Sequence, residues 1–192
     1  EQEAMLFAGR DALWYVEQHP LAFSEGGAQG HGYYRAPNPP FGANFTYYLS
    51  EDISSLEEIR QEREKPLNEA NENTPFPGFD AITAEIQEID PVILLTVRDA
   101  DGNIVRRLEG PANKGFHRVN WDLRYPNTTT VFVPEGEEDE PSGFLVSPGN
   151  YTVSLARRVR GVTSDVVGPL SFSVNRLGDG ALRPLLDSSA FW

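Results

Sequence analysis

The sequence predicts an all-β fold, an antiparallel β-sandwich with an inserted helix and long loops. Two observations favour this class. Apolar and polar residues alternate along short segments such as 43–49, which is the period of a strand with one buried face. In the second half of the chain such segments recur about every 8–12 residues, and Gly-, Asn- or Pro-containing turns separate them, as is typical of a sandwich.

The first clear strand is expected at Ala43–Leu49, directly after two prolines and a glycine. Phe45, Tyr47 and Leu49 face one way in this segment, and Tyr48 faces the other way. We therefore expect one buried and one outward-facing set of aromatic side chains on this strand.

The second half of the chain predicts five more strands. The turn at Asp99–Asn103 is a tight reversal in which Gly102 is free to adopt a positive φ. The expected strands are Val92–Arg98, Ile104–Leu108, Phe116–Trp121, a segment around Tyr151–Leu155, and Val166–Val174.

Residues 50–80 interrupt the strands with a helix and a solvated loop. Apolar residues recur there at helical spacing, Ser50 is a suitable N-cap, and two acidic residues follow it in the first turn. Pro66 and the Asn/Glu/Pro-rich residues after it are expected to end the helix.

These patterns divide the chain into three parts. Residues 1–40 form an irregular N-terminal segment, with a short helix or strand between 4 and 17 and a Gly/Pro-rich loop after it. Residues 41–176 form the β-sandwich, including the insertion at about 50–80 and an acidic loop at about 125–147. Residues 177–192 are a C-terminal extension.

Composition limits the function classes. Among 192 residues, 16 are basic and 29 acidic, which gives a net charge of −13. Residues 1–90 contribute −12 of this charge, so that nucleic acid and anionic membranes are unfavourable partners. The chain has no cysteine, which excludes disulfides, thiolate zinc sites and a cysteine nucleophile. No apolar run approaches the ~20 residues of a membrane helix.

Several segments resemble a known family. They are "LFAGRDALWYV", "NPPFGANFTYYL", "LLTVRDADGNIVRRLEGPANKGFHRVNWDLR" and "SPGNYTVSL". The pattern of the last two segments is similar to the Ig-like or fibronectin-type-III-like module of flagellar hook-capping proteins. It is more similar to the C-terminal module of bacterial sortilin-like, BNR-repeat β-propeller proteins, some of which are labelled glycosyl-hydrolase-like. The first two segments resemble the stretches that lead out of the propeller in that family.

This resemblance implies an Ig-like or fibronectin-type-III-like sandwich that follows a β-propeller in a secreted or periplasmic bacterial protein. The catalytic groups of such proteins belong to the propeller, so that no catalytic residue is transferred to this chain. We expect a piece of a longer protein, a non-enzymatic accessory module with the propeller as its intramolecular partner and a further protein or a glycan as a second one.

Titratable side chains give few candidates for chemistry. Asp122 and Arg124 lie two residues apart on one expected strand, so that we expect them to share a face and to form a structural ion pair, with each other or with a neighbour, next to Trp121. A small hydrolase that uses Asp122 and a loop carboxylate is the enzymatic alternative. The Asp-rich turn at 99–103 lacks the Gly and Glu of a calcium loop, and the three histidines are scattered. We expect no metal and no cofactor.

Aromatic residues are the remaining candidates for binding. An aromatic ring can pack against a neighbouring domain, or it can stack on the apolar face of a sugar, which makes a carbohydrate-binding accessory module the second hypothesis. The candidate binding residues are Tyr33, Tyr34, Phe41, Tyr48, Trp121, Asp122 and Arg124.

Overall fold

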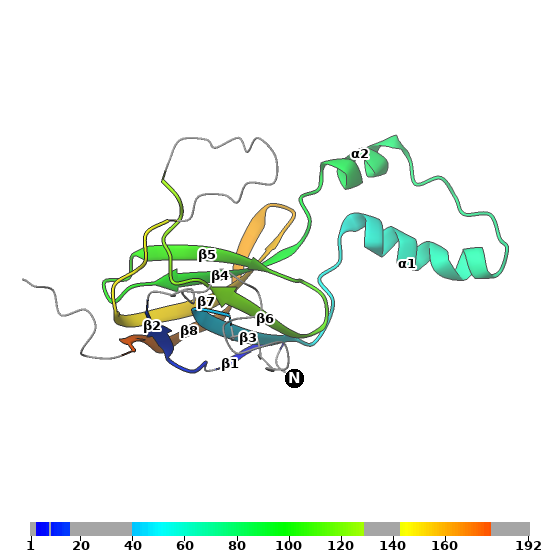
Figure 1. The fold of residues 1–192 in the computed structure, drawn as a ribbon. Coiled ribbons are helices and arrows are strands. Elements are labelled where there is room, and N and C mark those ends of the chain that lie inside the picture. The colour runs from blue at the N-terminus through cyan, green and yellow to red at the C-terminus, as the bar shows by residue number, and fades with distance from the viewer. Residues whose placement is uncertain (1–2, 8, 16–39, 129–142, 178–192) are drawn as a thin grey trace, which may run out of the picture.

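The structure, a computed structural model, describes residues 3–7, 9–15, 40–128 and 143–177. Two β-sheets form its body (Figure 1). Sheet A has the order β1-β3-β6 and is antiparallel throughout. Its strands are β1 (Ala4–Phe7), β3 (Ala43–Leu49) and β6 (Gly115–Trp121). The all-β class predicted from the sequence is confirmed.

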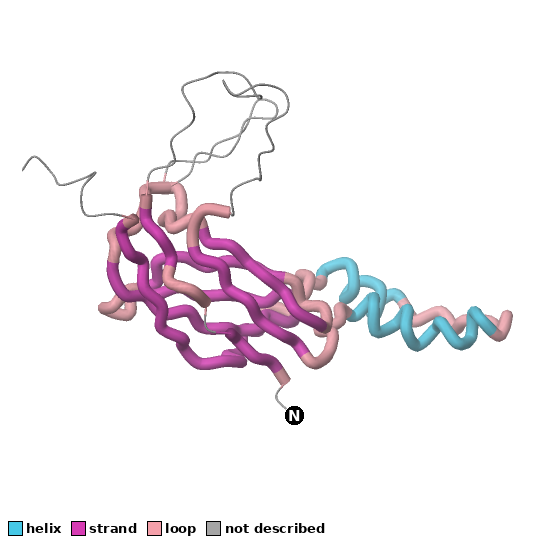
Figure 2. Tube along the Cα trace, turned by 60° about the horizontal axis from the view of Figure 1, so that its bottom comes forward, coloured by secondary structure: helices cyan, strands magenta, loops and turns pink. Residues whose placement is uncertain are grey.

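Sheet B has five strands in the order β2-β8-β7-β4-β5, and Figure 2 shows it together with sheet A. The strands β4, β5, β7 and β8 pair in antiparallel fashion, whereas β2 pairs in parallel with β8. The bounds are β2 (Ala12–Trp14), β4 (Val92–Arg98), β5 (Ile104–Gly110), β7 (Gly149–Val159) and β8 (Val162–Arg176).

The N-terminal segment contributes a strand to each sheet instead of being irregular throughout. The side chains of Ala4 and Leu6 in β1 are buried, and so is that of Ala12 in β2. Because β1 pairs with β3 and β2 pairs with β8, this segment links the two sheets at one edge.

A single apolar core lies between the sheets. Tyr47 and Trp121 of sheet A and Ile93, Leu95 and Leu155 of sheet B are 0% exposed. These residues alternate with more exposed neighbours along their strands, as the period of two predicted. Gly42 is required at the start of β3, since a Cβ there would lie 1.9 Å from the Trp121 carbonyl oxygen and its φ is +114°.

The turn at Asp99–Asn103 is as the sequence predicts. The Asp99 carboxylate accepts hydrogen bonds from the backbone N–H groups of Asp101 and Asn103, and Gly102 has a φ of 84°. The side-chain amide of Asn103 also donates to this carboxylate and, together with the backbone donors, lowers the pKa of Asp99. The turn is therefore held by its own acidic residue, as expected for a hairpin.

Two helices form an arm between β3 and β4 that projects from one end of the body (Figures 1 and 2). They are α1 (Leu56–Glu69) and α2 (Phe79–Gln87). The predicted N-cap at Ser50 is wrong, because Ser50 bonds to the Glu3 carbonyl oxygen at the end of sheet A. Ser55 is the N-cap of α1.

The helices also differ from the prediction at their ends. α1 continues past Pro66 for another turn, because the Pro66 carbonyl still accepts from the Ala70 N–H and the Leu67 carbonyl from the Glu72 N–H. The helix α2 was not predicted; it begins at the end of the expected loop and lies mostly after residue 80. Within the described residues, neither helix is long and apolar enough to cross a membrane.

Candidate functional site

The outer face of sheet A has a cluster of apolar side chains, which we call the aromatic patch. It consists of Met5 and Phe7 of β1, Tyr48 of β3 and Phe116 of β6. Met5 lies opposite Tyr48 in one ladder, and Tyr48 lies opposite Phe116 in the next. Each of these residues alternates with a more buried neighbour that faces the core, so that the four side chains lie on one outward surface.

The rings of the aromatic patch touch one another. The ring centroids of Tyr48 and Phe116 are 4.9 Å apart with the planes inclined by 47°, and those of Phe7 and Phe116 are 5.8 Å apart and inclined by 34°. Phe116 is nevertheless 71% exposed and Met5 40% exposed. The patch is thus a group of rings inclined to one another, and not a row of coplanar rings.

Polar side chains continue the same surface toward the other end of β3 and β6. Asn120 Nδ2 donates to Asn44 Oδ1 over 3.3 Å, and the exposed Arg118 lies opposite Thr46. An apolar centre with a polar border is the arrangement found in many protein–protein contact surfaces.

Among the predicted binding residues that the structure describes, Tyr48 is therefore the one that lies on this surface. Phe41 is half-buried and packs edge-to-face on Tyr15, with ring centroids 5.0 Å apart. Tyr33 and Tyr34 lie outside the described residues.

Trp121 is part of the core and is inaccessible to a ligand. Its indole N–H donates to the Arg124 carbonyl over 3.0 Å, and its ring meets those of Tyr151 and Phe172 edge-on at 5.7 and 6.2 Å. The indole thus fills the space between the sheets, as its place on an alternating strand suggested. It does not contribute to a sugar-stacking surface.

The predicted ion pair of Asp122 with Arg124 is wrong. β6 ends at Trp121, and Leu123 turns the chain with a φ of 57°. The Asp122 carboxylate then accepts from the Arg124 backbone N–H, while the Arg124 guanidinium donates to the Gly143 carbonyl over 2.8 Å. Both side chains fix the base of the acidic loop.

Two buried tyrosines have perturbed hydroxyl groups. Burial raises the pKa of Tyr47, whose hydroxyl donates to the Pro111 carbonyl over 2.6 Å. Burial also raises the pKa of Tyr151, whose hydroxyl donates to the Ser147 carbonyl over 2.6 Å. Each hydroxyl is occupied by a backbone acceptor, so that both tyrosines have a structural role.

A groove of about 440 Å³ opens where β1 and β8 face each other without pairing. Leu49 and Ile93, both buried in the core, line it together with Val166. An ion pair between Arg157 and Glu3 spans the two sheets beside the groove. The groove is a seam between the sheets that side chains of the chain itself bridge.

No group of three or more His, Asp or Glu side chains within the described parts of the chain has an arrangement that holds a metal ion. Searches against protein-family models, curated proteins and solved structures return no significant match.

Sequence reasoning missed three members of the aromatic patch. Alternation along 116–121 correctly places Phe116 on the opposite side of its strand from Trp121, but it does not predict the pairing of Phe116 with Tyr48. Met5 and Phe7 were missed because the sequence left residues 4–17 open between a helix and a strand. A period of two read across 4–7 would have placed both on the outward side.

Proposed function

We propose that the body is an Ig-like or fibronectin-type-III-like β-sandwich. Two features support this assignment. Three strands, β1-β3-β6, face a sheet in which β7 lies between β4 and the last strand β8. The hydroxyl of Tyr151, near the start of β7, donates a hydrogen bond to a carbonyl four residues upstream, which is the tyrosine-corner arrangement of this fold class.

We further propose that the chain is a non-catalytic accessory module of a larger exported protein. In this role the module packs its aromatic patch against a neighbouring β-propeller. The observation that supports the proposal is the exposed Phe116 ring in contact with Tyr48 and Phe7. Full burial of one such ring contributes about 1.5–3 kcal/mol, so that a patch of this size suits an interface between domains.

A carbohydrate-binding module is the second candidate, and the same exposed rings favour it. Sugar stacking needs flat, accessible ring faces, however, and the rings of Tyr48 and Phe116 are inclined and in contact with each other. This geometry favours insertion into a protein cavity over stacking on a pyranose. We therefore rank protein docking first.

The experiment is a Phe116→Ser substitution in the full-length protein that contains this chain. We expect the module to be released faster by limited proteolysis and to melt separately from its neighbour. The matched control is Val162→Ser, which removes a similarly exposed apolar side chain (68%) from the β7–β8 hairpin. Unchanged proteolysis and melting in the Phe116 variant would refute docking. Saturable oligosaccharide binding by calorimetry, lost in the same variant, would support the second candidate instead.

A further inference from the structure

The arm of residues 54–90 presents apolar side chains to solvent. Neither of its helices has a buried residue. Phe79 and Ile86, seven residues apart and hence on the same side of α2, are 81% and 79% exposed. Phe76, 64% exposed, packs its ring edge-on against that of Phe79 at 5.1 Å, and Ile89, 60% exposed, follows the helix.

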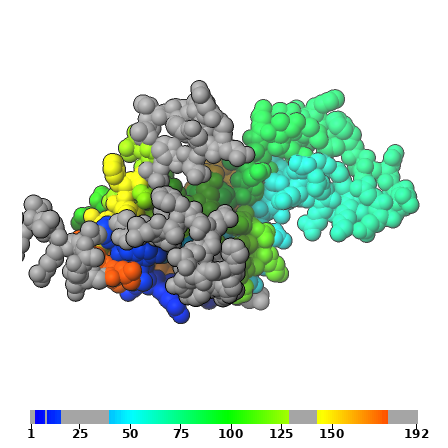
Figure 3. Space-filling view, viewed as in Figure 1, coloured from blue at the N-terminus to red at the C-terminus, as the bar shows by residue number. Residues whose placement is uncertain are grey.

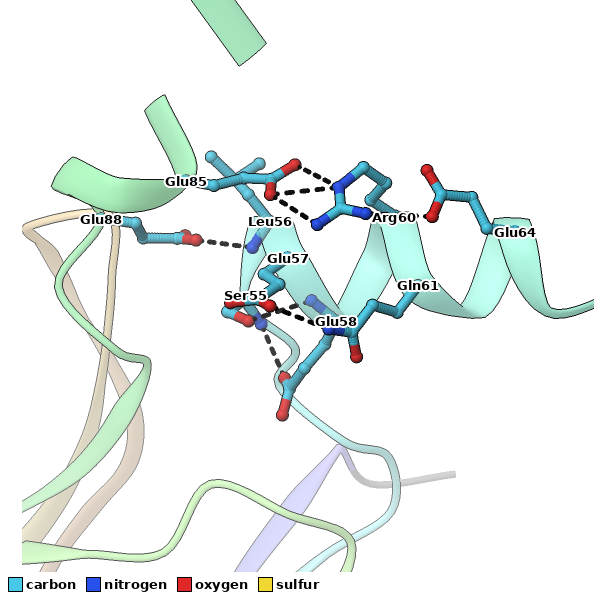
Figure 4. A network of polar contacts seen from close by, with 9 residues as sticks. All are labelled: Ser55, Leu56, Glu57, Glu58, Arg60, Gln61, Glu64, Glu85 and Glu88. Carbon is cyan, nitrogen blue, oxygen red and sulfur yellow. Dashed lines mark hydrogen bonds and ion pairs between the residues drawn. The ribbon is translucent and has the colours of Figure 1, made fainter. Parts of the chain in front are cut away.

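This apolar face belongs to an ordered helical hairpin. In the space-filling view the arm projects from one side of the body (Figure 3). Within α1, Arg60 bonds to Glu64 at 3.0 Å. Arg60 also forms bidentate hydrogen bonds to Glu85 of α2, at 2.8 and 3.0 Å (Figure 4). These contacts hold α2 against α1 without using Phe79 or Ile86.

The base of the arm is also fixed. Ser55 and Glu58 form a reciprocal capping box at the start of α1, and the Glu88 carboxylate accepts from the Leu56 N–H (Figure 4). The same Glu88 carboxylate lies 3.5 Å from the Arg160 guanidinium of the β7–β8 hairpin. The apolar face is therefore held in place before any partner binds, which lowers the entropy cost of association.

The charge of the arm indicates what kind of partner surface the apolar face of α2 would fit. The arm has 10 acidic and 3 basic residues, a net charge of −7. Arg60 is paired with Glu64 and Glu85, and Glu88 is half-buried at the base of the arm. The exposed charged side chains of the arm are therefore seven acidic ones and two basic ones, Arg63 and Lys65. An apolar face with this border is complementary to an apolar surface bordered by cations.

We propose that the α2 face docks on another protein, at an apolar surface bordered by lysine and arginine. Two arms of this chain repel each other, and so do the arm and a phosphate-bearing surface. Three arginines of the body, Arg157, Arg158 and Arg160, are occupied by Glu3, Glu109 and Glu88, and the net charge of −13 disfavours association with a second copy of the chain. A separate cationic protein is thus the occupant that the charges favour.

The test uses a fluorescent amphipathic helical peptide, with leucines on one side and lysines beside them, titrated with the chain and followed by anisotropy. We expect saturable binding that weakens as salt is raised, and at least tenfold weaker binding by the Phe79→Ser/Ile86→Ser double variant. Circular dichroism verifies that the double variant keeps its helices. Val162→Ser, which removes a 68% exposed apolar side chain outside both the α2 face and the aromatic patch, is the matched control and is expected to bind normally.

Two comparison peptides complete the design, one with glutamates in place of the lysines and one with the same composition in scrambled order. We expect neither to bind comparably. Equal binding of the scrambled peptide, an unaffected double variant, or no binding of the cationic peptide would overturn the proposal. Sedimentation that shows self-association of the chain, abolished in the double variant, would assign the face to a second copy and would also overturn it.

Discussion

The β body and the helical arm are held together by different interactions. In the body, Tyr47, Ile93, Leu95, Trp121 and Leu155 are fully buried between two sheets. In the arm no helical residue is buried, and the side-chain ion pair between its helices joins the Arg60 guanidinium to the Glu85 carboxylate. Polar bonds thus hold the helices together, while the side chains of Phe79 and Ile86 stay exposed.

The two regions should therefore respond differently to substitution. Loss of a core side chain in the body removes apolar burial and leaves a cavity, which lowers the free energy of unfolding of the whole body. Loss of a polar bond in the arm opens the arm locally and leaves the body intact.

Trp121→Ala is expected to have the largest effect. It leaves a cavity between the sheets and removes the indole N–H bond to the Arg124 carbonyl, so that we expect a loss of about 3–5 kcal/mol in the free energy of unfolding. Urea denaturation followed by circular dichroism measures it. Phe116→Ala, at the exposed end of the same strand, is the control and should cost far less. Similar losses in both variants would contradict the assignment of Trp121 to the core.

Arg60→Lys tests the arm. The Glu85 hydrogen bond is the main cause that raises the pKa of Arg60, which stays charged, but an ammonium group cannot reproduce the two-pronged contact. We expect amide hydrogen exchange in α2 to become about tenfold faster, while the urea midpoint of the body is unchanged.

Arg63→Lys, at an exposed position of the same helix, is the matched substitution and should leave exchange in α2 as it is. If Arg60→Lys lowered the midpoint of the body as well, the arm and the body would unfold as one unit, and the distinction drawn between them would fail.

Asp99→Asn is expected to have the smallest effect, confined to one hairpin of the body. Hydrogen bonds lower the pKa of Asp99 in the folded state, so that its ionised form stabilises the fold above the unfolded-state pKa of about 3.9. This contribution is lost as the pH falls through the lower, folded-state pKa. The variant should have a slightly lower urea midpoint at pH 7, and the difference should disappear in strong acid. A difference that persists there would show that the carboxylate charge has no part in the turn.

Local patterns were sufficient to predict most strands. The bounds of β3 follow from alternation, β4 lies in the longest apolar run of the chain, and the Asp99–Asn103 turn follows from its residue types. The outward position of Tyr48 was predicted in the same way. Each of these features depends on neighbours in the sequence, which is where a period of two is informative.

Features that depend on distant residues were not predicted. Ser50 bonds to Glu3, 47 residues earlier, whereas Ser55 forms a capping box with Glu58, a local signal that the prediction did not use. Asp122 and Arg124 were predicted to share a face of one strand, but β6 ends at Trp121 and Leu123 has a positive φ. The aromatic patch likewise depends on cross-strand register between 48 and 116, which sequence periodicity does not determine.

The chain leaves β3 and returns to β4 through two fixed points. On the way out, the Ile53 N–H donates to the Ala112 carbonyl and the Asp52 carboxylate accepts from the Lys114 N–H. On the way back, Glu88 meets Arg160. The positions of β3 and β4 are thus fixed independently of the length of the segment between these points. The entropy cost of closing a loop also grows only slowly with its length. This junction is an insertion site, at which segments of other sizes can replace the arm without altering the flanking strands β3 and β4.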